Sequence, residues 1–315
     1  MDRILIIGVD TPLGRRVALN LLKQGLNIRG TYLQAVTDLP QEVATVPLPD
    51  PSVEGDWLQL LDGITHVIHL DEFAAGDRKS TGFEVIMPDS GVTGRLALAA
   101  TAKGVKRFLY LSSVQAMTDH TLPGKPLAWR TIYQPANAYG RMKLESERLI
   151  ARQCAQAGVE WQIIRVPDVY GPDIDSPLLD LVQLVKNRRL IAIGFSVNQM
   201  AFIHIDNLAQ LIALAVMHPR GGNEALLASD GKNVSTPELL RYIAHALDRW
   251  LVLLPLPHIL LRFFSKDRKP ARSAQLIPCH SLAIDDSHTR EAIDWQPLLT
   301  PMAGIKDLVR SVVDS

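Results

Sequence analysis

The fold of this chain is decided by the stretch Ile4-Leu5-Ile6-Ile7-Gly8-Val9-Asp10-Thr11-Pro12-Leu13-Gly14. Four consecutive apolar residues are typical of a strand that is buried on both faces of a parallel sheet. The residues that follow form a glycine-containing turn of the kind that holds a phosphate group at the positive end of a helix: Gly8, Thr11, Pro12, Leu13 and Gly14. Thr11 stands where a middle glycine is expected. The stretch predicts the first strand, turn and helix of a nucleotide-binding domain.

The same alternation of apolar runs and helical patterns continues to about residue 170. Strands are expected at Ile4–Ile7, Asn27–Tyr32, Ala44–Pro47, His66–Leu70, Arg107–Leu111 and Trp161–Val166, and helices at Arg15–Gln24, Val92–Lys103 and Tyr139–Ala157. We therefore predict an α/β fold, a doubly wound parallel Rossmann sheet in residues 1–172 with a smaller C-terminal α/β substrate lobe in residues 173–315. Residues 195–216 are expected to return to the Rossmann domain.

Composition narrows the class of protein. The 315 residues contain 33 basic and 33 acidic side chains, so net charge gives no reason to expect a nucleic-acid partner. Two cysteines, Cys154 and Cys279, make neither a disulfide framework nor a metal site, and we expect reduced thiols, a cytoplasmic protein and no metal. The most apolar later stretch, Trp250 to Phe264, is interrupted by prolines and shorter than a membrane span, so no transmembrane segment is expected.

A catalytic pattern lies in the segment Tyr139-Gly140-Arg141-Met142-Lys143. The phenol and the ammonium are one helical turn apart on the same face. A nearby cation favours the phenolate form of a tyrosine, which makes it a useful acid or base. Ser112 and Ser113 follow the strand Arg107–Leu111 and place a hydroxyl at the carboxyl edge of the sheet. Ser113, Tyr139 and Lys143 are therefore the predicted catalytic residues, with Ser113 holding the substrate oxygen.

Several motifs together resemble one family, the extended short-chain dehydrogenases of the NAD-dependent epimerase/dehydratase type. The motifs are Gly14, Ser112-Ser113, Tyr139-Gly140-Arg141-Met142-Lys143, Arg165-Val166-Pro167-Asp168-Val169-Tyr170-Gly171-Pro172, Phe202-Ile203-His204-Ile205-Asp206-Asn207-Leu208, Ala228-Ser229-Asp230-Gly231 and Asp294-Trp295-Gln296-Pro297. The middle and last of them are most similar to bacterial enzymes that reduce or epimerise nucleotide sugars at carbon 4.

The resemblance implies a bound NAD or NADP and a nucleotide-sugar substrate. It implies that the cofactor meets the turn, the ends of the central strands and the catalytic helix: Gly8, Thr11, Pro12, Leu13, Gly14, Leu70, Asp71, Ser112, Tyr139, Lys143, Val166, Pro167 and Val169. The loop at Pro167 is expected beside the nicotinamide. Homodimers are expected through the helices corresponding to 89–103 and 139–157.

Three departures from the family pattern concern the cofactor, the substrate and the reaction. No acid ends the second strand, whereas Arg29 lies within it, which favours NADP because an arginine can bind a 2′-phosphate. Met200 stands where many members carry an arginine for the diphosphate, and a thioether offers no charge-assisted hydrogen bond. Val114 and Gln115 replace the acids of the family's dehydratases, which argues against elimination. Ser113, Gln115, Asp168 and Met200 are the expected substrate contacts.

The sequence leaves alternatives open for the substrate and for the class of function. Met200 and the apolar stretch Leu251–Phe264 also suit a reductase of a hydrophobic, sterol- or lipid-like ketone. A non-catalytic dinucleotide-binding sensor or scaffold would explain the altered turn, but such a protein has no need of Ser113, Tyr139 and Lys143. Reduction and epimerisation use the same three residues, so the sequence does not separate them.

Overall fold

The computed structural model of the chain describes residues 2–33, 39–50, 53–70, 90–194, 198–256 and 281–314. The strands are β1 (Arg3–Ile7), β2 (Asn27–Tyr32), β3 (Val43–Pro47), β4 (His66–His69), β5 (Arg107–Ser113), β6 (Glu160–Val166), β7 (Asp168–Tyr170), β8 (Leu190–Gly194), β9 (Phe202–His204), β10 (Glu224–Leu227) and β11 (Val252–Leu256). The helices are α1 (Pro12–Leu22), α2 (Glu54–Leu60), α4 (Ser90–Ala102), η1 (Val114–Ala116), α5 (Ala138–Ala157), α6 (Pro177–Asn187), α7 (Ile205–Met217), α8 (Thr236–Ala246), α11 (Ser287–Ile293) and α12 (Pro301–Val313).

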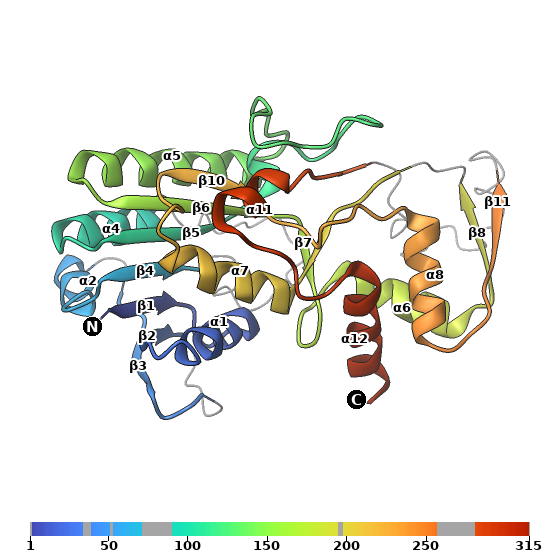
Figure 1. The fold of residues 1–315 in the computed structure, drawn as a ribbon, viewed down its shortest axis with the longest axis horizontal. Helices are drawn as coiled ribbons and strands as arrows, with labels where there is room; N and C mark the ends of the chain where they lie inside the picture. The colour runs from blue at the N-terminus through green and yellow to red at the C-terminus, as the bar shows by residue number, and fades with distance from the viewer. Residues whose placement is uncertain are drawn as a thin grey trace.

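The central sheet is parallel throughout, in the order β10-β6-β5-β4-β1-β2-β3. Alternate residues of each strand face opposite sides, so Ile4 and Ile6 pack under α1 and α7, whereas Leu5 and Ile7 pack under α2 and α4. Figure 1 shows these helices as two layers around the sheet. The predicted doubly wound α/β fold is confirmed.

After the first six strands, a later part of the chain returns to this sheet. Helix α7 lies against α1, and β10 then adds a seventh strand beside β6. The part of the C-terminal half that joins the sheet in this way runs from 205 to 227. A division of the chain into two domains at residue 172 stays a prediction.

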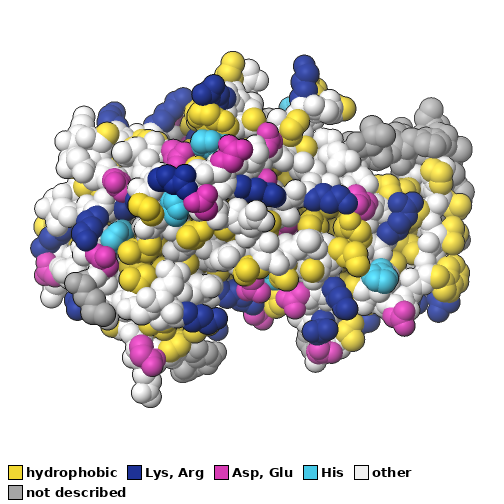
Figure 2. Space-filling model, in the orientation of Figure 1, with side chains coloured by type: hydrophobic (Ala, Val, Ile, Leu, Met, Phe, Trp, Pro, Cys, Tyr) yellow, Lys and Arg dark blue, Asp and Glu magenta, His cyan; other side chains and the backbone are white. Residues whose placement is uncertain are grey.

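A separate apolar cluster holds the remaining C-terminal elements together. It joins α6, α8 and α12 through residues such as Leu181, Leu240 and Leu308, and the parallel pair β8 and β11 forms its outer end (Figure 1). On the face drawn in Figure 2, basic and acidic side chains are interspersed rather than gathered by sign. Within the described residues, none of the helices combines the length and the apolar character that crossing a bilayer requires.

Candidate active site

Four of the sequence-predicted segments meet at the carboxyl edge of the sheet. The turn Gly8–Gly14 follows β1, Leu70 follows β4, Ser112 and Ser113 end β5, and Val166 ends β6 next to Pro167. Because these strands are parallel neighbours, their carboxyl ends lie along the same edge, where such sheets bind ligands. Val169 follows in β7 and is half-buried. Asp71 lies outside the described residues.

The turn after β1 is built around two glycines. Gly8 has a φ of +90°, and a Cβ on Gly14 would lie 2.1 Å from the carbonyl oxygen of Gly8. Only glycine permits that approach of helix to strand. The turn therefore has the compact backbone that brings a helix N-terminus up to a dinucleotide pyrophosphate, and the residues present fit NAD at this position.

Thr11 and Pro12 change what the turn can donate. Thr11 is the N-cap of α1: its hydroxyl donates to the Gly8 carbonyl oxygen at 2.7 Å and accepts from the Gly14 N–H at 3.0 Å. Pro12 has no N–H. In the first turn of the helix, the Leu13 N–H is therefore the backbone donor that neither residue removes.

Arg29 is not brought to this turn. Its guanidinium donates to the carbonyl oxygen of Leu60 at 2.6 Å and to that of Asp62 at 3.4 Å. Both carbonyls precede β4 and lie towards the amino ends of the strands, away from the edge that carries the glycine turn. The predicted contact between Arg29 and a 2′-phosphate has no support in this geometry, because the pleat of β2 puts Arg29 on the face covered by α2 and its guanidinium binds at the C-terminal end of that helix.

The elements that carry Ser113 and Tyr139, η1 and α5, are in close contact through Gln115. Ser113 is the N-cap of η1, and its Oγ accepts from the Gln115 N–H at 3.2 Å. A Cβ on Gly140, in the first turn of α5, would lie 2.1 Å from the Gln115 carbonyl oxygen. Asn137 caps α5 and also donates to the Gln115 side chain at 3.1 Å. Glycine at 140 thus lets α5 pack closely against the turn that carries Ser113.

Lys143 is buried beside two tyrosines. Its side chain is in the protein interior, 1 % exposed, and Nζ lies 5.8 Å from the ring centre of Tyr139 and 5.0 Å from that of Tyr110. Nζ also donates to the Tyr110 hydroxyl at 3.1 Å. Tyr139 is half-buried, whereas Lys143 is enclosed in the protein. The predicted proximity of Tyr139 and Lys143 is present.

Tyr110 and His69 were not assigned a role by the sequence reasoning. Tyr110 pairs with His69 across β4 and β5, with ring centres 5.5 Å apart. His69 Nε2 in turn lies 3.0 Å from the Thr93 hydroxyl on α4. The available signal was a tyrosine within a fully buried strand, three residues before Ser113. These side chains fix the position of the Lys143 ammonium.

A buried ion pair anchors α5 to the sheet. Glu147, one turn after Lys143, accepts from the Arg165 guanidinium at 2.6 and 2.9 Å and from the Ser112 hydroxyl at 2.5 Å. Both charged side chains are 3 % exposed. Ser112, predicted as a cofactor contact, is fully buried and makes this internal hydrogen bond instead of facing the ligand edge. Its role here is to tie β5 to α5.

The structure does not bring the remaining predicted substrate residues together. Gln115 is bound to Asn137, and Asp168 is exposed in β7. Met200 is 6 % exposed and packs in the apolar cluster of α6, α8 and α12. It is therefore a core residue and does not offer a contact to a phosphate. Arg189 stacks on Trp250 at the outer end of that lobe and does not replace the missing arginine.

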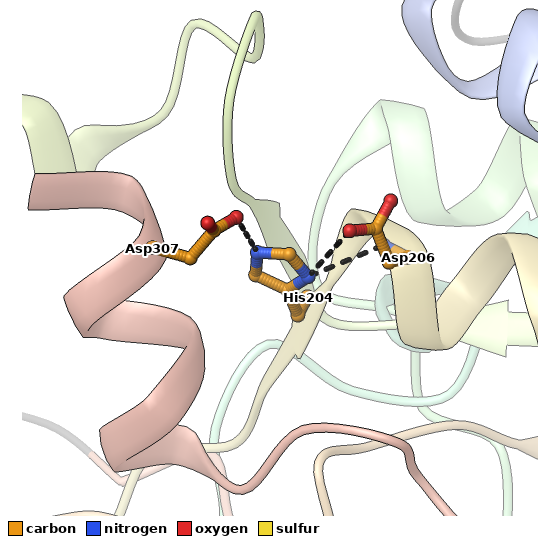
Figure 3. Close-up of side chains that lie close together, drawn as sticks. All are labelled: His204, Asp206 and Asp307. Atoms are coloured by element: carbon orange, nitrogen blue, oxygen red, sulfur yellow. Dashed lines mark hydrogen bonds and ion pairs between the residues drawn. The ribbon is translucent and has the colours of Figure 1, made fainter. Parts of the chain in front are cut away.

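His204, Asp206 and Asp307 form the one group of three described side chains with metal-ligating spacing. His204 is fully buried; its Nδ1 accepts from the Asp206 N–H at 3.3 Å, and its Nε2 lies 3.4 Å from Asp307. Figure 3 shows the carboxylates at opposite edges of the ring. Burial lowers the pKa of His204, against the opposing effect of both carboxylates. Each ring nitrogen of His204 therefore already faces a partner. We interpret the group as structural: it caps α7 and links α12 to that helix.

Comparison with known proteins identifies the family of the chain. Residues 4–227 match the model of the NAD dependent epimerase/dehydratase family. A UDP-glucose 4-epimerase of Vibrio cholerae is 32 % identical over 224 residues, which cover 71 % of this chain and 68 % of the relative.

Two solved structures have the same fold. A UDP-N-acetylglucosamine 4-epimerase of Bacillus cereus superimposes with a TM-score of 0.76 at 16 % identity, over 98 % of this chain and 99 % of that one. A Thermus thermophilus UDP-glucose 4-epimerase in complex with NAD gives 0.74 at 18 % identity, over 99 % of both chains. The family model covers more than half of the sequence. The chain belongs to the NAD-dependent epimerase/dehydratase family.

Proposed function

We propose that the protein epimerises a nucleotide sugar, with a UDP-hexose as substrate and a secondary alcohol carbon as the reacting centre. The observation that carries the proposal is the buried Lys143 ammonium beside the Tyr139 ring, on a helix that Gly140 presses against the turn of Ser113. The named relatives, which are 4-epimerases of UDP-sugars, support the substrate class.

The chemistry assigned to the chain is proton transfer at the reacting hydroxyl. The positive charge on Lys143 stabilises Tyr139 as the phenolate. The phenolate Oη takes the hydroxyl proton, which makes it a neutral phenol, and the phenol later returns the proton to the substrate oxygen. Ser113 Oγ donates a hydrogen bond to the same substrate oxygen and orients it. Bound NAD supplies the hydride acceptor and donor at the attached carbon.

The cofactor is assigned to residues at the carboxyl edge of the sheet. The turn Gly8–Gly14 holds the pyrophosphate, with the Leu13 N–H as a backbone donor. Tyr139 and Lys143 meet the nicotinamide ribose, and Val166 and Pro167 border the nicotinamide. Leu70 and Val169 complete the set, and Asp71 stays a prediction.

Replacing Thr11 with glycine is expected to strengthen NAD binding. The change releases the Gly14 N–H from its side-chain cap and makes it available to the pyrophosphate, which should lower Kd about tenfold. A glycine N-cap costs only about a few tenths of a kcal/mol in stability. Isothermal titration calorimetry checks the result. Thr11→Ser keeps the cap and serves as the control with wild-type affinity; equal or weaker NAD binding by Thr11→Gly would sink the explanation.

We also infer that the protein is a cytoplasmic homodimer assembled through α4 and α5. The two helices pack side by side on one face of the sheet, where Leu98 is 56 % exposed. Light scattering should give twice the monomer mass, and Leu98→Glu should shift the measured mass towards that of the monomer; a monomeric wild-type protein contradicts the inference.

The cysteine of α5 bears on the compartment. Cys154 is free and buried, and burial raises the pKa of its thiol to about 12, which suits a reducing compartment.

The proposed activity is tested by incubating the protein with NAD and UDP-glucose. Proton NMR should show a second anomeric signal from the 4-epimer, and the same final mixture should form from UDP-galactose. A reductase of hydrophobic ketones would instead consume NADH with a sterol-like ketone and leave both UDP-sugars unchanged. A sensor would bind the dinucleotide and turn over neither substrate.

A further inference from the structure

We propose that Asp10 selects NAD over NADP in this protein, by placing its carboxylate where the adenosine ribose hydroxyls are bound. The proposal rests on the function proposed above, because it concerns the cofactor of that same site. It assigns to the glycine turn a task that Rossmann domains usually give to an acid at the end of the second strand.

The carboxylate of Asp10 lies at the carboxyl end of β2. Its Oδ2 accepts from the Leu33 N–H at 2.9 Å, one residue beyond the last residue of that strand. The carboxyl end of β2 is where a ribose-binding acid is expected, and β2 itself ends in Thr31 and Tyr32. The chain therefore has an acid at this place in space, although it has none at this place in the sequence.

The position of Asp10 is fixed by tight packing between the turn and β2. The Val9 N–H donates to the Thr31 carbonyl oxygen at 2.9 Å, and the Gly8 N–H donates to the Thr31 hydroxyl at 3.3 Å. A Cβ on Gly30 would lie 2.4 Å from Val9 Cγ1. Glycine at 30 thus allows the turn to lie directly against β2, which carries Asp10 to the strand end.

The negative charge of Asp10 favours a diol over a phosphate at this point. A carboxylate accepts hydrogen bonds from the 2′- and 3′-hydroxyls of NAD, whereas the 2′-phosphate of NADP brings about two negative charges against it. Arg15, a cation of α1, donates to the backbone carbonyl oxygen of Asp10 at 3.4 Å, and its charge opposes this preference. Arg29, the cation of β2, is engaged with Leu60 and Asp62 towards the other edge of the sheet.

Asp10→Asn tests the assignment, with Arg29→Gln as the matched control. Asparagine retains a side-chain oxygen for the Leu33 N–H, loses the negative charge, and has an NH2 donor in place of the second carboxylate oxygen. We expect wild-type protein to bind NAD at least about tenfold more tightly than NADP, and Asp10→Asn to narrow that ratio about tenfold by gaining NADP affinity. Arg29→Gln should leave the ratio unchanged. Calorimetric titration of both cofactors measures the constants.

Salt dependence gives a second measurement that needs no variant. Raising the ionic strength from about 0.01 to about 0.3 M screens the repulsion between Asp10 and the 2′-phosphate, so the NADP to NAD ratio of Kd values should narrow in wild-type protein. Three outcomes would each overturn the assignment. Wild-type protein would bind the two cofactors equally, the NADP to NAD ratio of Kd values would stay unchanged in Asp10→Asn, or NADP binding would depend on Arg29. Binding of neither cofactor removes the proposed function together with it, whereas NAD binding without discrimination removes the assignment alone.

Discussion

Replacing Tyr139 with phenylalanine is expected to lower kcat about 10³-fold and to leave the Kd for NAD within about twofold. The phenylalanine ring takes the place of the tyrosine ring, whose centre lies 5.8 Å from Lys143 Nζ in the wild-type protein, so the local packing is retained. The hydroxyl that accepts and returns the substrate proton is lost. Turnover of the UDP-sugar and calorimetric titration of NAD measure the two effects separately.

A second tyrosine provides the control for that change. Tyr242 in α8 donates to Glu238 at 2.7 Å in the C-terminal lobe, outside the site. Tyr242→Phe removes a hydroxyl of the same kind and should turn over at the wild-type rate. Turnover by Tyr139→Phe at more than about a tenth of the wild-type rate would be incompatible with general acid and base catalysis by this residue.

Replacing Glu147 with methionine is expected to lower the free energy of unfolding by about 3–5 kcal/mol. Methionine preserves the apolar volume but leaves the Arg165 guanidinium, which is 3 % exposed, without its carboxylate. The Ser112 hydroxyl loses its acceptor at the same time. Urea denaturation followed by circular dichroism measures the change, and the loss of anchoring of α5 should lower kcat as well.

Two further variants separate burial of charge from loss of an ion pair. Glu238→Gln removes a partly exposed pair with Lys232 and should cost less than about 1 kcal/mol. Glu147→Met combined with Arg165→Met removes both buried charges and should regain most of the lost stability. A cost for Glu147→Met no larger than that for Glu238→Gln would show that the buried pair does not hold the helix.

The sequence predicted those parts of the molecule that depend on local patterns. Buried strands appeared as continuous apolar runs, and the spacing of Tyr139 and Lys143 placed them on one helical face. The seventh strand, β10, escaped because Glu224–Leu227 is short and gains its identity from pairing with β6. Pairing between distant segments is decided by tertiary contacts rather than by local propensity.

The side chains around the site were harder to predict because their direction depends on packing. Arg29 was expected at the cofactor, but its place in the pleat of β2 sends it to Leu60. Asp10 was treated as a turn residue, although the contact of Gly30 with Val9 brings it to the end of β2. In both cases the residue type was visible in the sequence, whereas its neighbour was not.

The most direct test of the account follows the hydrogen at the reacting carbon. UDP-galactose carrying deuterium at carbon 4 is incubated with the protein and NAD in ordinary water, and the 4-epimer is analysed by mass spectrometry. Reversible hydride transfer within the site, with Tyr139 handling only the hydroxyl proton, predicts that the UDP-glucose formed retains the deuterium. Formation of UDP-glucose that has exchanged its deuterium with solvent, or no formation of UDP-glucose at all, would contradict the account.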